Sequence, residues 1–180
     1  MTRVFTCLLA LPLLTGTVFA QRGSAAYDPE KTLGAPGQDE DFLKNAMNNT
    51  SAEIEWSKIA QQKTSNADVK ALAGQTVDDE MPVASRLVGE AKALNVKPPN
   101  GLSGKQKKES DKLNGLSGAD FDKEYLSALE KVQHDDVGNY IEEAKDSRRS
   151  NLQSFAKSTS DTVTTRNDKT KSLRKDLDGK

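Results

Sequence analysis

The fold is decided by residues 69–94, VKALAGQTVDDEMPVASRLVGEAKAL. Small and apolar residues recur in this segment at intervals of three and four, the spacing that places side chains along one face of an α-helix. They are Val69, Leu72, Ala73, Thr76, Val83, Leu87, Ala91 and Leu94. Asn66 stands just before the segment, where its side chain can cap a helix N-terminus. The pattern predicts one long amphipathic helix with a single buried face.

Three other stretches show the same spacing, and no strand pattern of comparable length competes with them. We expect long helices over about 41–62, from the cap at Ser117 to a turn at 146–150, and from that turn to 177. A short connecting helix is expected over 105–113, between the second and third long helices. Because short turns make consecutive helices antiparallel, the sequence predicts an all-α, up-and-down four-helix bundle.

The first twenty residues have the features of a cleavable signal peptide. Arg3 precedes an apolar run at 4–14, and Val18 and Ala20 supply small residues at the cleavage positions. The run is shorter than the roughly 20 residues that a membrane-spanning helix needs. We therefore expect a periplasmic or secreted protein with cleavage after Ala20.

The mature chain is expected to carry a flexible leader followed by one domain. Residues 21–38 contain Gly, Ser, Ala and Pro without an apolar period, and the bundle domain is placed at 39–177. The only cysteine, Cys7, lies in the signal peptide, so the mature protein must be stabilised by packing without disulfides.

The charge balance argues against a nucleic-acid partner. The chain has 26 Lys and Arg and 27 Asp and Glu, a formal net charge of −1. Basic residues gather only at 164–180, which could contact an anionic envelope surface. Basic residues in a last helical turn are also favoured by the helix dipole, so this pattern leaves both interpretations open.

Four polar residues stand where apolar ones are expected. Glu53 continues the apolar series of the first long helix, Glu80 that of the second, and Arg166 that of the fourth. His134 lies eight residues after Leu126, three before Val137 and seven before Ile141, which places it on or beside the buried face of the third helix. The sequence therefore predicts an inward polar cluster of Glu53, Glu80, His134 and Arg166.

Two kinds of chemistry fit such a cluster. Glu53, Glu80 and His134 are residue types that could ligate a divalent metal in the core of a helical bundle. Alternatively, Arg166 neutralises the two glutamates in a structural ion-pair network, with His134 hydrogen-bonded to one of them. A guanidinium repels a metal cation and cannot become a ligand, so we favour the ion-pair network and expect no cofactor.

The residues also resemble a known family, the domain of unknown function 4142 family, over about 39–173. The resemblance rests on FLKNA at 42–46, AEI at 52–54, VKALA at 69–73, VDDE at 77–80 and GADFDKEY at 118–125, with Pro98, His134 and Phe155-Ala156 in agreement. It implies an exported, ferritin-like helical bundle, of a kind often labelled predicted outer-membrane protein. The family pattern has histidines at the places that Glu80 and Arg166 occupy here, which favours the ion-pair network over an inherited metal site.

The sequence lacks the usual catalytic motifs: there is no glycine-rich phosphate loop, no Glu-x-x-His pair and no Gly-x-Ser-x-Gly elbow. We expect a non-enzymatic protein of the envelope that works by binding, and by family analogy one concerned with stress or envelope upkeep. The alternative is a ferritin-like metal protein with a carboxylate and histidine site in its core.

Overall fold

The computed structural model describes residues 36–179, and within them the chain forms helices and turns but no strand. The prediction of an all-α protein is confirmed. The helices are α2 (Pro36–Lys63), α3 (Ala67–Ala93), α4 (Gly104–Gly115), α5 (Gly118–Asp146) and α6 (Ser150–Asp178). The proposed signal peptide and most of the proposed leader lie outside the described residues.

The start of α2 corrects the predicted boundary of the leader. Residues 36–38 are helical, whereas the sequence analysis assigned them to the leader. Proline suits the first helical position because its missing N–H would have no partner there. The buried carboxylate of Asp39 also anchors this turn, since Arg149 donates to it from Nε at 2.9 Å. Local sequence periodicity does not predict an ion pair between residues that are far apart in the chain.

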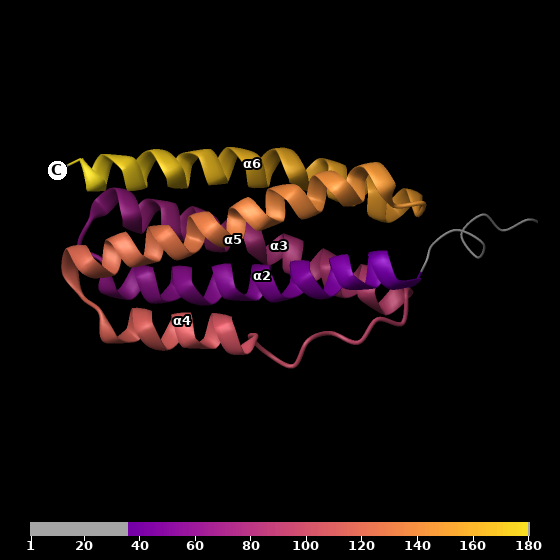
Figure 1. Ribbon diagram of the computed structural model, residues 1–180, viewed down its shortest axis with the longest axis horizontal. Coiled ribbons are helices and arrows are strands. Elements are labelled where there is room, and N and C mark those ends of the chain that lie inside the picture. Colours follow the sequence, from indigo (N-terminus) through magenta and orange to yellow (C-terminus); the bar gives the residue numbers. More distant parts are fainter. Residues whose placement is uncertain (1–35, 180) are drawn as a thin grey trace, which may run out of the picture.

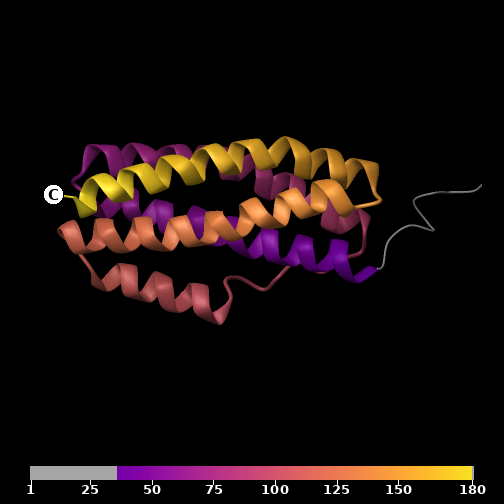
Figure 2. The same ribbon diagram turned by 45° about the horizontal axis from the view of Figure 1, so that its top comes forward.

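Four long helices lie side by side, and the short helix α4 runs along α2 and α5 (Figures 1 and 2). The pairs α2–α3 and α5–α6 pack most extensively, while α2 also contacts α5 and α3 contacts α6. The Asn66 cap is present, with its Oδ1 accepting from the backbone N–H of Asp68 at 2.9 Å. Ser117 occupies the N-cap position of α5 but makes no side-chain capping bond.

The apolar core is divided into two clusters. The cluster near the start of α2 comprises Phe42, Leu43, Ala46, Met47, Leu87, Ala91, Val96, Tyr140, Leu152, Phe155, Ala156 and Val163. The cluster near the other end comprises Ala52, Trp56, Ala60, Val69, Leu72, Ala73, Leu113, Phe121, Tyr125, Leu126, Leu129 and Val132. On every long helix, buried polar residues stand at the changeover between the two clusters, so a polar layer crosses the middle of the core.

Helix α4 is held to the domain by polar contacts. Ser103 and Gln106 form a capping box at its start. Trp56 donates from its indole Nε1 to Ser110 Oγ at 3.0 Å, and this hydroxyl donates to Glu55 Oε1 at 2.6 Å.

None of the helices within residues 36–179 combines the length and the hydropathy that crossing a membrane requires.

Candidate functional site

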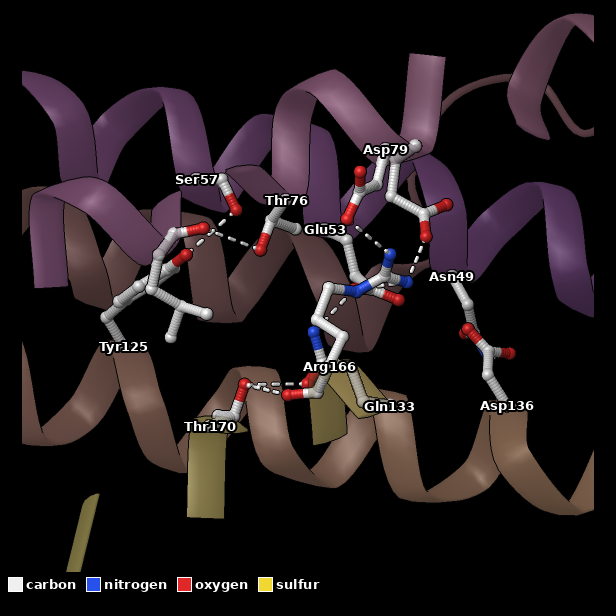
Figure 3. Close-up of polar contacts among 12 residues, drawn as sticks. Asn49, Glu53, Ser57, Thr76, Asp79, Tyr125, Gln133, Asp136, Arg166 and Thr170 are labelled. Atoms are coloured by element: carbon white, nitrogen blue, oxygen red, sulfur yellow. Dashed lines mark hydrogen bonds and ion pairs between the residues drawn. The ribbon is translucent and has the colours of Figure 1, made fainter. Parts of the chain in front are cut away.

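Arg166 forms the centre of the polar layer (Figure 3). Its Nη2 donates a hydrogen bond to Glu80 Oε1 on α3 and lies 3.5 Å from Glu53 Oε2 on α2. Its Nη1 lies 3.8 Å from Asp79 Oδ2. The Arg166 side chain is 3% exposed and that of Glu53 is 0% exposed. One guanidinium on α6 thus joins carboxylates from α2 and α3 away from solvent.

Two neutral side chains extend the network from Glu53. Gln133 on α5 donates from Nε2 to Glu53 Oε2 at 3.0 Å. The hydroxyl oxygen of Thr170 lies 2.8 Å from Gln133 Oε1 and 3.0 Å from the Arg166 carbonyl oxygen, and its single hydrogen is shared between these two acceptors. Helix α5, the third long helix, therefore contributes the amide of Gln133 where an imidazole was predicted.

The prediction that His134 points inward is wrong, because its side chain is exposed. One residue corresponds to about 100° around a helix, so the neighbours of a buried residue are turned away from the core. Val137 and Ile141 indicated the wrong helical face, because Ile141 is 53% exposed and Val137 is only half-buried. The buried face of α5 instead carries Leu129, Val132, Gln133, Asp136 and Tyr140.

Asp136 is a third buried carboxylate of the layer, beside Glu53 and Glu80, and it was not among the predicted inward residues. It accepts a hydrogen bond from Asn49 Nδ2 at 2.7 Å, and Gln106 on α4 donates to Asn49 Oδ1 at 3.1 Å. Burial, followed by the charge of Glu80, raises the pKa of Asp136 to about 7 against the opposing effect of the Asn49 hydrogen bond. Its spacing of four residues from Tyr140 and of seven from Leu129 was the available signal.

The layer holds more acid than base. Four carboxyl groups, those of Glu53, Asp79, Glu80 and Asp136, surround one guanidinium. Burial and then the Glu80 charge raise the pKa of Glu53 well above its usual range, although Arg166 opposes both. Burial lowers the pKa of Arg166, but the attraction of Glu53 and Glu80 outweighs it and the net shift is upward. The arrangement can hold a fixed positive charge, and Asp136 can bind a proton near neutral pH.

The residues of the layer do not fit a metal ion. The guanidinium of Arg166 contacts both Glu53 and Glu80, the carboxylates that would have to share a cation. His134, the remaining member of the alternative ligand set, is exposed and takes no part in the layer. Among residues 36–179, no three His, Cys, Asp or Glu side chains are grouped so that they could hold a metal. The geometry matches an ion-pair network.

Fold and site together define an all-α protein with long packed helices and a buried ion-pair layer. The profile of the family described as Domain of unknown function (DUF4142) matches residues 24–173. The chain therefore belongs to this family, as the sequence motifs indicated.

The fold is also found in a solved structure, "Crystal structure of DUF305 fragment from Deinococcus radiodurans". The similarity has a TM-score of 0.67 and covers 77% of this chain and 95% of that chain, at 10% sequence identity. At this identity the likeness concerns the fold alone. No curated protein matches the chain in sequence.

Proposed function

We propose that this protein is exported and works as a non-enzymatic binding protein of the periplasm or outer-membrane surface, built as a ferritin-like, up-and-down four-helix bundle. The observation that carries the proposal is the contact of Arg166 with both Glu53 and Glu80. A reactive metal centre in a bundle needs these positions for ligands, and here they are engaged in ion pairs. The layer is then structural, and the binding role belongs to the surface.

The basic end of α6 offers less free charge to a partner than its sequence suggests. Arg166 is buried, and Arg174 donates to Glu130 Oε2 at 2.6 Å. Lys169 donates to Gln75 Oε1 at 2.6 Å, but this neutral amide leaves the ammonium charge in place. The burial of Arg166 and the pairing of Arg174 support placing the binding role elsewhere than on the basic residues of α6.

Metal content tests the proposal directly. Protein purified from the periplasm without chelators should contain far less than one iron, manganese or zinc per chain by elemental analysis. Glu53→Gln serves as the matched variant. If the core held a metal ion, loss of this carboxylate would lower the metal content. If the layer is an ion-pair network, the variant and the wild type should both contain no metal. Stoichiometric metal in the wild type that is lost in Glu53→Gln would overturn the proposal in favour of a ferritin-like metal protein.

Export is tested by the mass of the mature chain. Expressed with its own N-terminus, the protein should be recovered from the periplasm with a mass that begins at Gln21, because the small residues Val18 and Ala20 precede the expected cleavage position. Replacing Ala20 with Arg should block this cleavage. Recovery of an uncleaved wild-type chain from the cytoplasm would contradict the export proposal.

A further inference from the structure

A cavity of about 450 Å³ lies between the first turns of α2 and the last turns of α5. Its charged lining residues are Asp41, Glu142 and Glu143, and no Lys or Arg is among the described residues that line it. The amides of Asn45 and Asn139 and the side chain of Phe42 form further parts of the wall. The cavity is therefore acidic, with a partly apolar wall. The start of α2 and the end of α5, which supply its lining residues, lie at the same end of the domain (Figure 1).

Glu143 is the residue that distinguishes this cavity from an ordinary acidic surface. It is 1% exposed, and within the described part of the chain its Oε1 has no hydrogen-bond partner. A buried carboxylate oxygen without a partner is unfavourable, and a bound donor would remove that cost.

Arg149, the basic residue that contacts Asp39, is already engaged. Arg149 donates to Asp39 Oδ2 at 2.9 Å, and Ser147 donates to Asp39 Oδ1 at 3.3 Å. Arg149 thus pairs with Asp39, whereas within the described residues Glu143 has no cationic partner. Burial, and then the charge of Asp39, raises the pKa of Glu143 to about 7, so Glu143 is ionised at pH 8 and largely protonated at pH 5.5.

We propose that this cavity binds an organic cation, namely the guanidinium or ammonium group of a basic peptide side chain, with Glu143 as the buried acceptor and Asp41 and Glu142 at its sides. An organic cation fits better than a metal ion because no three acidic side chains of the described residues are grouped for metal ligation. The side chain of Phe42 provides apolar surface for the methylene stem that such a group carries. This inference rests on the proposed binding role and gives it a ligand class.

The test is an NMR titration of the ¹⁵N-labelled mature protein with Nα-acetyl-arginine amide at pH 8, with Nα-acetyl-lysine amide as the ammonium counterpart. Saturable shifts are expected at the side-chain amides of Asn45 and Asn139. Glu143→Gln should raise the Kd at least about tenfold, because a charge-assisted hydrogen bond is lost. The exposed Glu142→Gln should raise it by about two- to threefold, and it carries the test if Glu143→Gln does not fold.

Two controls separate the cavity from general charge attraction. Asp161→Asn removes an exposed acid on α6 that does not line the cavity, and it should leave the Kd unchanged. At pH 5.5 binding to the wild type should weaken, whereas binding to Glu143→Gln should change little.

Three results would overturn the inference. They are chemical shift changes only at residues outside the cavity, equal affinities of wild type, Glu143→Gln and Glu142→Gln, and displacement of the arginine derivative by Ca²⁺. Each of these results is independent of the metal content of the core.

Discussion

Replacing Arg166 with Leu is expected to lower the free energy of unfolding by about 3 to 5 kcal/mol, the range measured when one partner of a buried ion pair is removed. The change leaves Glu53 and Glu80 in the core without their counter-charge, and both are almost fully buried. Chemical denaturation of wild type and variant at pH 8 measures the difference.

Arg174→Leu is the matched control on the same helix. Arg174 also pairs with acids, at 2.6 Å from Glu130 and 3.6 Å from Asp178, but its side chain is 40% exposed. Exposed pairs contribute only about 0 to 1 kcal/mol, so this variant should unfold nearly as the wild type does. Equal stability losses in the Arg166 and Arg174 variants would contradict the central place of Arg166.

The double variant Arg166→Leu with Glu80→Leu distinguishes an unpaired charge from a packing defect. Because replacing a buried ion pair by apolar residues is often neutral, the double variant should recover much of the stability lost in Arg166→Leu. A double variant less stable than Arg166→Leu alone would show that the layer is needed for more than charge compensation.

The second large effect is a rise in stability as the pH is lowered from 8 to 5. The pKa of Asp136 is about 7 in the folded protein and about 3.9 in an unfolded chain. The folded state therefore binds this proton more tightly than the unfolded chain does. Protonation of Asp136 makes its full contribution to the free energy of unfolding below the unfolded pKa, and this contribution is lost as the pH rises through 7. Because pH 5 lies about two units below the folded pKa, the expected gain between pH 8 and pH 5 is about 3 kcal/mol, at about 1.4 kcal/mol for each unit.

Asp136→Asn tests this assignment. The variant should be more stable than the wild type at pH 8 by about 2 to 4 kcal/mol, because it removes a buried charge and keeps an oxygen that can accept from Asn49. Its stability should also vary less with pH, although Glu53 and Glu143, whose pKa values are raised as well, retain part of the slope. Denaturation curves at pH 5, 6, 7 and 8 measure both quantities.

The neighbouring Asp135→Asn provides the control, because the Asp135 side chain is exposed and its replacement should change the free energy of unfolding little. An unchanged pH slope in Asp136→Asn, or an equal change in Asp135→Asn, would contradict the role given to Asp136.

The inward placement of Glu53, Glu80 and Arg166 was predictable from the sequence because each continues a long apolar series on its own helix. In α5 the same procedure failed. Two neighbouring faces of α5, offset by one residue, both fit the apolar spacing. The face that includes Val137 and Ile141 was predicted to be buried, and this placed His134 inward. The actual face includes Gln133 and Asp136, whose polar side chains hide it from a search for apolar residues. Which of two such faces is buried depends on the neighbouring helices.

The sequence alone determined that the chain is helical, where its long helices lie and which family it belongs to, because these depend on local spacing and on motifs in a fixed order. Only the tertiary structure decided which polar groups meet. Arg166 and Glu80 are 86 residues apart along the chain, as Asn49 and Asp136 are 87 apart. Such contacts depend on how whole helices are rotated and packed against one another. The burial of Glu143 and the cavity beside it depend on the same two features. A repeating local pattern carries no information about the rotation or the packing of helices.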